Sequence, residues 1–437
     1  MTVTTLACGV LLLALLPTSG AFASSAANRQ TTGTVTKQSW QKVLRNALSF
    51  TSTPSSSSTT TTSNTGSGIG SSSIAAPVPP SSYSIPAGAA VVSSSSQLVS
   101  ALAAGTPAIV LADGTYGVSA GFDDSSSSSL YAQHLGDAVL TTGLTVGGNF
   151  GSGGAVIEGL AFNVTNPSTT FQNSEVNIWG ASGERTHVLD CTFSGNWAIG
   201  VGLDAVNPNG LVAQRLTFAD FTDGGLRASD NAHASYGGST AVINSITDIS
   251  VNGVSKSTPG ASDGTAEAGI WVGEPISNGV HRILIKNVSN AGIETVNNSW
   301  NTTFSDLNIN MSGPHAASGV GVYMEHSTTH DTFTNFVITG TATGFNAEWD
   351  DGIAGNAAAH SDTIENGTID ASGWTRTGNT AGVYLDAGTG PMTVTNVAFK
   401  NQNWAGIGAY RNIGPNSFSG NTYQLATGAV QMSANHV

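Results

Sequence analysis

The chain is poor in cysteine, and this excludes a fold held together by disulfides. Of its two cysteines, Cys8 lies in an N-terminal apolar stretch and only Cys191 lies beyond it. Once that stretch is removed, no intrachain disulfide can form. The setting Asp190-Cys191-Thr192-Phe193 places the sulfur at an inward strand position, so we expect Cys191 to be a buried apolar side chain and not a nucleophile.

Charged residues are also scarce, at 9% of the chain, and most of them are acidic. Four of the 13 Lys and Arg residues precede residue 50, whereas all 27 Asp and Glu residues lie beyond residue 100. Phosphate binding relies on clustered Lys and Arg, so this distribution argues against a nucleic-acid partner. A polyanionic glycan would also be repelled, unless a divalent cation such as calcium intervened.

Long hydrophobic runs are missing too. The apolar run from Leu6 to Leu16 is too short to span a bilayer, and Ala21-Phe22-Ala23 after it has the small-x-small form of a cleavage site. Residues 1–23 are therefore predicted to be a secretory signal peptide, with a short membrane anchor as the alternative. No other segment is apolar enough to span a membrane, so we expect a secreted or cell-wall-associated protein without stable membrane insertion.

Residues 24–84 have the composition of a linker. The stretch from Thr51 to Ser84 is rich in Ser, Thr, Gly and Pro and has almost no apolar content. Within the linker, residues 39–50 could form a short amphipathic helix that contacts a membrane surface or a partner, or an incidental local helix.

The folded part is predicted to span residues 85–437 and to begin with a short helix. Ser96 to Leu102 has helical spacing with a Ser near the N-cap, and a strand at Ala108 to Leu111 follows. The turn Asp113-Gly114-Thr115-Tyr116 comes next. We expect the helix to cover the open end of a stacked sheet.

A six-residue signature, apolar-x-(Asn/Asp)-apolar-x-apolar, recurs through the rest of the chain. In Phe333-Thr334-Asn335-Phe336-Val337-Ile338 the apolar alternation slips by one residue at Asn335, and Asn tolerates the left-handed conformation of a sharp bend. This predicts a strand, a one-residue corner, a second strand, a loop and a third strand. Further corners are expected at Gly159, Asp190, Arg215, Asp248, Asn287, Asp306, Asn366 and Asn396. We expect these corner residues to form a buried hydrogen-bonded ladder and not a reactive site.

A Gly leads an alternating strand after most corners, as in Gly269-Ile270-Trp271-Val272 and Gly321-Val322-Tyr323-Met324. With 54 glycines and no long helical periodicity, the pattern predicts an all-β chain, a single parallel β-helix (solenoid) with a short N-terminal capping helix. These features resemble the right-handed parallel β-helix proteins of the pectate-lyase-like superfamily. The segment from Ser96 to Tyr116 is similar to the N-terminal coil of chondroitinase-B and alginate-lyase-type relatives, and the resemblance implies a right-handed solenoid.

The outward positions of the Gly-led strands carry the candidate site. Counting from the Gly as zero, positions one and three should point inward and positions two and four should face solvent. Position two collects Arg227, Trp271, Glu294, Tyr323, Asn346 and Tyr384, and position four collects Asp204, Glu325, Glu348, Asp386 and Tyr410. Neighbouring coils stack ~4.8 Å apart, so Glu325, Glu348 and Asp386 are expected to form a carboxylate ladder, with Trp349 and Asp350 at its edge.

Like charges at sheet spacing are destabilising, so a carboxylate ladder calls for an explanation. Glycoside hydrolysis needs an acid and an ionised partner beside the sugar, with aromatic rings for stacking. The predicted catalytic residues are Glu325, Glu348, Asp386 and Asp350, and the predicted substrate-binding residues are Trp271, Tyr323, Trp349, Tyr384, Glu294 and His326. A calcium site and a solvated acidic face remain as alternatives.

Other candidates were weighed against these carboxylates. His326, His330 and His360 fall near the proposed cleft and could assist proton transfer, but their spacing matches no metal motif. Asp350-Asp351 resembles the Asp pair of polygalacturonase-like glycosidases, whose Gly-His-Gly and Arg-Ile-Lys motifs are absent. No match to the catalytic Lys and Arg motif of the lyase relatives is found.

The sequence therefore predicts a secreted carbohydrate-active protein that cleaves an extracellular polysaccharide, without a cofactor. The weak basicity favours a hydrolase acting on a neutral glycan. A calcium-assisted polysaccharide lyase and a non-catalytic surface or matrix protein are the alternatives.

Overall fold

The computed structural model describes residues 83–126, 128–148, 154–171, 173–180, 185–206, 208–229, 241–254, 268–296, 299–312, 319–325, 328–347, 359–386, 388–410 and 415–435. All of them belong to one compact unit of the chain. The predicted signal peptide and residues 24–82 of the predicted linker lie outside these ranges. No helix in the described ranges is long and apolar enough to cross a membrane.

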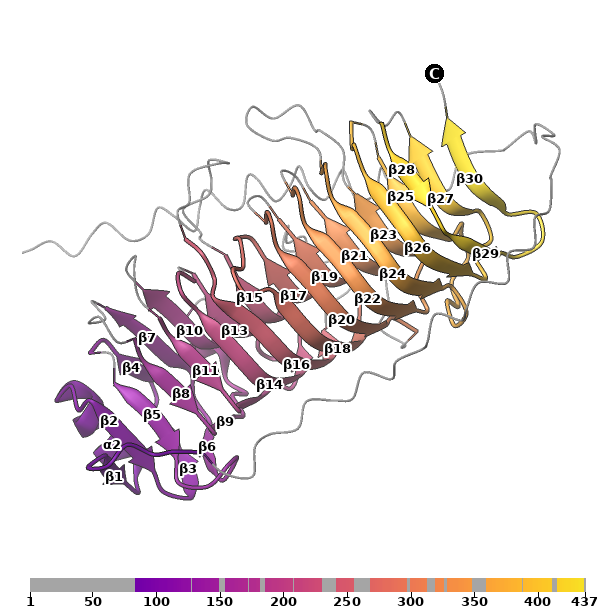
Figure 1. The fold of residues 1–437 in the computed structure, drawn as a ribbon. Coiled ribbons are helices and arrows are strands. Elements are labelled where there is room, and N and C mark those ends of the chain that lie inside the picture. The colour runs from indigo at the N-terminus through magenta and orange to yellow at the C-terminus, as the bar shows by residue number, and fades with distance from the viewer. Residues whose placement is uncertain are drawn as a thin grey trace, which may run out of the picture. The chain divides into compact units, whose positions relative to one another are not determined.

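The chain winds into a parallel β-helix, in which each coil adds strands beside those of the previous coil (Figure 1). One sheet, which we call sheet I, takes a single strand from each coil. In order along the stack it comprises β4 (Phe122–Asp124), β7 (Leu144–Gly148), β10 (Ser174–Gly180), β13 (Val201–Ala205), β15 (Gly224–Ala228), β17 (Ala268–Val272), β19 (Ala291–Thr295), β21 (Val320–Met324), β23 (Thr343–Ala347), β25 (Ala381–Leu385), β27 (Ala405–Tyr410) and β30 (Val430–Asn435).

The second sheet, sheet II, is bent and contributes two faces to each coil. Its strands are β1 (Ala90–Val92), β2 (Ala108–Leu111), β3 (Gly114–Tyr116), β5 (Ser129–Ala132), β6 (Ala138–Leu140), β8 (Val156–Glu158), β9 (Ala161–Phe162), β11 (His187–Leu189), β12 (Thr192–Ser194), β14 (Val212–Phe221), β16 (Ser245–Val254), β18 (Val280–Val288), β20 (Thr303–Asn310), β22 (Thr332–Thr339), β24 (Thr363–Asp370), β26 (Thr393–Lys400), β28 (Ser417–Ser419) and β29 (Thr422–Gln424). The shorter strands pair with the two halves of β14, so β11 and β12 are the first and second face of one coil.

The bend between the two faces of sheet II is made at a left-handed residue in the middle of each long strand. Asn335 has φ 51° in the middle of β22, and Asn366 and Asn396 have φ 56° in β24 and β26. This confirms the predicted strand, corner and second strand, and β23 is the third strand of the same coil.

Two predictions about the corners were wrong. The residues that flank Asp248 pair with those that flank Arg282, so Arg282 is the corner of β18 that aligns with the other predicted corners. Asn287 does adopt the predicted left-handed conformation, with φ 58°, but it marks a second bend near the end of β18. Nor is the ladder buried, because Asn335, Asn366 and Asn396 are exposed on the outside of the bend. A corner residue turns its side chain away from the core, where the amide can still reach the next coil, as Asn396 Nδ2 does by donating to Asn366 Oδ1 over 3.2 Å.

Apolar side chains fill the coil interior in rows along the stack. Phe193 stacks on Phe162 and Phe218 with ring centroids 5.0 and 4.6 Å apart. Phe304 and Phe333 are stacked in the same way, at 4.6 Å. Burying each such ring contributes roughly 1.5–3 kcal/mol, so the rows supply the stability that disulfides do not. Cys191 lies in this core with 1% of its surface exposed, as predicted.

The predicted capping helix is present as α2 (Ser95–Ala103), and a short 3-10 turn, η1 (Pro167–Thr169), occurs further on. The Ser94 side chain accepts a hydrogen bond from Gln97 N and caps the first turn of α2. Leu98 and Leu102 of α2 are buried in the core at the first coil, so the helix covers the end of the stack where the apolar interior would otherwise meet water (Figure 1).

Candidate active site

One row of side chains runs along the outer face of sheet I, and we call it the outer row. Backbone pairing aligns Asp123, Thr145, Asn177, Asp204, Arg227, Trp271, Glu294, Tyr323, Asn346, Tyr384, Gly408 and Ser433. The residues on either side, such as Ile270 and Val272, are fully buried in the core, as the alternation predicts. Trp271, Glu294 and Tyr323 therefore lie side by side on neighbouring strands.

The prediction that position two faces solvent was wrong for most of this row. Glu294 and Tyr323 are each 2% exposed and Tyr384 is 7% exposed, whereas Trp271 is half-buried. Side chains stacked in register lie ~4.8 Å apart and cover one another's flanks, so little of each remains accessible. The row is a packed polar layer on the outside of the sheet.

Asp204 belongs to the outer row and not to position four, where the sequence count placed it. The strand carries glycines at both Gly200 and Gly202, and the pairing of Asp204 with Arg227 shows that Gly202 is the one in register. Arg227 Nε and Nη2 donate to the two Asp204 oxygens at 2.9 and 2.5 Å.

The positive charge of Arg227 is satisfied within the protein. Its Nη1 lies 3.5 Å from Asp223 Oδ2, and its guanidinium lies 5.7 Å from the Trp271 ring centroid. Burial alone would lower the pKa of Arg227, but the Asp204 carboxylate outweighs it and the pKa is raised. Arg227 is thus held as a charged, paired group beside Trp271.

Glu325 and Asp386 occupy the position that follows β21 and β25. Glu325 N donates to Thr295 O at 2.8 Å, and Asp386 N donates to Ala347 O at 3.1 Å, so both continue the register of sheet I. Met324 and Leu385, which precede them, each pair with Ala347 of β23. One strand therefore separates the two carboxylates, a backbone distance of ~9.6 Å.

The surroundings of these two carboxylates differ. Asp386 is 7% exposed and Glu325 is half-buried. Burial, and then the charges of Asp386 and Tyr410, raise the pKa of Tyr384. The structure describes Glu325 and Asp386, the two outer members of the predicted ladder. The middle member, Glu348, lies outside the described residues, as do the predicted site residues Trp349, Asp350 and His326.

The sequence missed an aromatic side chain beside Tyr384. The Trp404 ring lies 5.9 Å from the Tyr384 ring, centroid to centroid. Trp404 comes from the turn before β27, and no strand periodicity marked it.

His330 and His360 share one hydroxyl on the outside of neighbouring coils. Thr329 Oγ1 lies 2.8 Å from His330 Nδ1 and 3.0 Å from His360 Nδ1. A hydroxyl has a single proton to donate, so the second contact requires a protonated Nδ1. Burial, and then the charge of His330, lower the pKa of His360.

The sequence also missed a buried pair of carboxyl groups. Asp331 N donates to Asp362 Oδ1 at 2.8 Å, and both residues are about fully buried, at 0% and 1% exposed. Burial raises the pKa of Asp331 to about 7, against the hydrogen bonds from Ser299 and Thr302. Burial and the charge of Asp331 raise the pKa of Asp362 as well.

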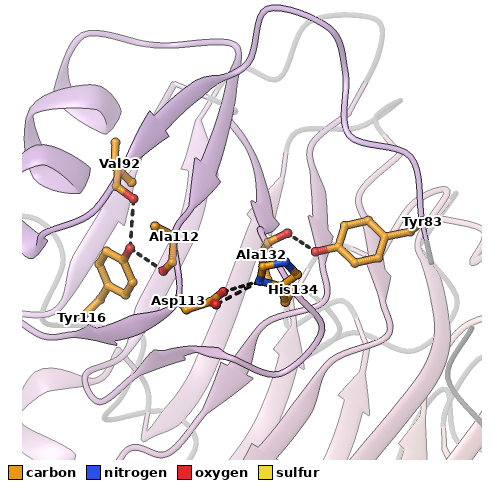
Figure 2. A network of polar contacts seen from close by, with 7 residues as sticks. All are labelled: Tyr83, Val92, Ala112, Asp113, Tyr116, Ala132 and His134. Carbon is orange, nitrogen blue, oxygen red and sulfur yellow. Dashed lines mark hydrogen bonds and ion pairs between the residues drawn. The ribbon is translucent and has the colours of Figure 1, made fainter. Parts of the chain in front are cut away.

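A separate polar network lies near the capping helix (Figure 2). The Tyr116 hydroxyl lies 3.0 Å from Val92 O and 2.7 Å from Ala112 O and can donate its proton to either carbonyl, which ties β3 to the first coil. His134 Nδ1 lies 2.9 Å from Asp113 Oδ1, in an exposed hydrogen bond. Asp137 lies within reach of both, so the three side chains could together hold a metal ion.

A shallow depression nearby is lined by hydroxyl and amide groups, among them Thr115, Thr141 and Asn166. It offers hydrogen bonds but no carboxylate or imidazole for acid–base chemistry.

The coil geometry, the left-handed corners and the capping helix define a right-handed parallel β-helix. No protein-family model matches the chain, and no curated protein matches its sequence. Among solved structures, the catalytic domain of an α-1,3-glucanase of family GH87 in complex with nigerose is similar, with a TM-score of 0.51 and 11% identity over 82% of this chain and 71% of that one. At this identity the likeness shows the fold.

Two other solved structures are similar at lower scores. The A-module of the Azotobacter vinelandii mannuronan C-5 epimerase AlgE4 has a TM-score of 0.41 and 14% identity over 79% of this chain and 97% of that one. The Streptococcus pneumoniae surface adhesin PfbA has a TM-score of 0.42 and 10% identity over 77% of this chain and 88% of that one.

Proposed function

We propose that the chain is a secreted polysaccharide-cleaving β-helix protein, a glycoside hydrolase with Glu325 and Asp386 as its acid–base pair. The observation that carries the proposal is the placement of these carboxylates at the ends of β21 and β25, one strand apart, beside the aromatic members of the outer row. Glycosidases need this combination of two carboxylates and a surface for a sugar ring.

The spacing favours hydrolysis with inversion. Inverting glycosidases hold their carboxyl groups roughly 6.5–9.5 Å apart to leave room for a water molecule, and two strand spacings give ~9.6 Å between the backbones. Asp386, which water scarcely reaches, is the better candidate for the protonated acid. Glu325, which is half-buried, is the better candidate for the base that activates water.

The charge of this surface favours a neutral glycan. Arg227 is the cation in the described outer row, and Asp204 and Asp223 already pair with it. Glu294 and Glu325 add acidic side chains to the same sheet, so a polyuronate would be repelled there. Because the similar glucanase was solved with nigerose, α-1,3-glucan and its oligosaccharides are the first substrates to try.

The test is the release of new reducing ends from α-1,3-glucan by the full secreted chain, with mannuronan as the polyanionic comparison. Glu325→Gln and Asp386→Asn are each expected to lower kcat by about 10²–10⁴-fold, the usual contribution of an acid–base group. Glu365→Gln, on the outer face of sheet II, is the matched control and should keep the wild-type rate. The first sugar released should have the inverted anomeric configuration by NMR.

The alternatives are outcomes of the same experiment. Full activity in both site variants would contradict the assignment of Glu325 and Asp386. Calcium-dependent release of unsaturated sugars from mannuronan would identify a lyase. Binding of a glycan without any cleavage would identify a non-catalytic surface protein.

A further inference from the structure

The outer row is interrupted at Gly408, and an indole fills the gap. Gly408 pairs with Tyr384 of the preceding strand. A Cβ atom on Gly408 would lie 2.5 Å from Trp404 Cη2 and 2.6 Å from Cζ3, closer than real Cβ contacts. The ring of Trp404 therefore lies over Gly408, in the space that a side chain of the outer row would otherwise take.

The backbone holds Trp404 firmly in this place. Trp404 N donates to Thr380 O at 3.2 Å, and Trp404 O accepts from Val430 N at 2.9 Å. The turn is thus tied to the coil before it and to the coil after it. Its ring is tilted by 50° against the ring of Tyr384, at 5.9 Å between centroids.

Accessibility separates the two rings. Tyr384 is 7% exposed, whereas Trp404 is half-buried, so Trp404 is the more accessible of the two residues. Asp386 lies two residues beyond Tyr384, at the end of the same strand. A partly accessible tryptophan therefore lies over the strand that neighbours β25, which the proposed acid follows.

We infer that Trp404 is the aromatic platform of a sugar-binding subsite beside Asp386, and that Gly408 is a specificity-determining residue because it leaves room for the indole. This rests on the proposed function and extends it. The ligand class is a neutral pyranose chain, because the C–H face of a pyranose packs on an indole. The acidic side chains of Glu294 and Glu325 on the same sheet disfavour a uronate there.

Two variants remove the platform in different ways. Trp404→Ala deletes the ring, whereas Gly408→Ala keeps the ring but displaces it, so both should weaken binding. Trp300→Ala is the matched control, since Trp300 is 48% exposed on a turn outside the outer row. Trp404→Phe retains a smaller ring and should restore part of the affinity.

Thermal unfolding first shows which full-chain variants fold. For those, the affinity for α-1,3-glucan is measured by sedimentation, and KM and kcat are measured with nigero-oligosaccharides. Trp404→Ala and Gly408→Ala are expected to raise Kd and KM by about tenfold, which corresponds to ~1.4 kcal/mol, with a smaller change in kcat. Quenching of tryptophan fluorescence by the sugar should be lost in Trp404→Ala and kept in Trp300→Ala.

The outcomes separate the inference from the proposed function. Wild-type KM and Kd in folded Gly408→Ala, and in Trp404→Ala where it folds, together with activity that Glu325→Gln abolishes, would overturn the subsite and leave the hydrolase standing. A wild-type chain that neither binds nor cleaves α-1,3-glucan or the other neutral glycans tried would overturn both.

Discussion

The buried carboxyl pair Asp331–Asp362 should make the fold less stable as pH rises. Asp331 Oδ2 accepts from Ser299 Oγ at 2.6 Å and Oδ1 accepts from Thr302 N at 2.8 Å, while Asp362 Oδ1 accepts from Asp331 N. Asp362 Oδ2 has no hydrogen-bond partner in the described part of the chain. Two carboxylates on adjacent coils with this little compensation favour the protonated form.

The sign follows from the direction of the shift. Burial raises the pKa of Asp331 from 3.8 to about 7, so the folded state binds this proton more tightly than the unfolded state does. The stabilising contribution is complete below the unfolded value and is lost as pH rises to about 7. The corresponding loss is on the order of 4 kcal/mol, at 1.36 kcal/mol for each pKa unit.

Asp362→Asn is the perturbation that isolates this effect. The asparagine keeps an oxygen for Asp331 N–H and removes the second titrating group. We expect urea denaturation to show the variant more stable than wild type at about pH 8, and equal or less stable at about pH 4.

Asp370→Asn is the control, and its stability relative to wild type should change with pH in the opposite direction. Burial raises the pKa of Asp370, but the hydrogen bonds from Asn401 and Ser372 outweigh it and the net pKa is lowered. A stability difference between Asp362→Asn and wild type that does not change with pH would refute the reasoning.

Three further predictions concern the fold. Asp190→Ala should lower the free energy of unfolding by roughly 3 kcal/mol or more, because the Asp190 carboxylate is buried against Arg215 at 2.6 Å. Asp248→Ala should lower it by under about 1 kcal/mol, because its partner Arg282 is half exposed, and equal losses in chemical denaturation would contradict this. Gly367→Ala should destabilise the protein by about 1–3 kcal/mol, since a Cβ there would lie 2.2 Å from the Phe336 ring, and an unchanged melting temperature would show that the ring can move. Burial raises the pKa of the Cys191 thiol to about 12, so an aromatic disulfide reagent should label it only on unfolding, and fast labelling of the native protein would disprove its burial.

The sequence revealed the coil because its signals are local. Each corner needs one residue that tolerates positive φ between two apolar triplets, and Asn335 and Asn366 satisfy this within six residues. The same rule misplaced the corner of β18, because Arg282 adopts φ 58° although Arg has no special tolerance for it. Its bidentate bonds to Asp248, on the neighbouring coil, compensate for the strain, and such a contact is not visible along the chain.

The candidate site was predictable where strand alternation alone determines which face of the sheet a side chain lies on. It was not predictable where the register between neighbouring coils must also be known. Alternation placed Tyr323 and Tyr384 on the outer face, and it placed Glu325 and Asp386 at strand ends. It failed at Asp204, where either of two glycines could start the count. Trp404 was missed because it lies in a turn, not in a strand. Its ring lies over Gly408, which has no side chain and therefore gave no signal in the sequence.

The regular stacking of sheet I restricts how this surface can change. Separations between groups on it come in whole steps of ~4.8 Å, so the gap between the carboxylates after β21 and β25 cannot be adjusted gradually by shifting a backbone. Two adjustments are available. A side chain can be lengthened by one methylene, or an entire coil, such as the one that contains β23, can be added or deleted. A lineage with this architecture would therefore move between reaction geometries by discrete jumps in coil number.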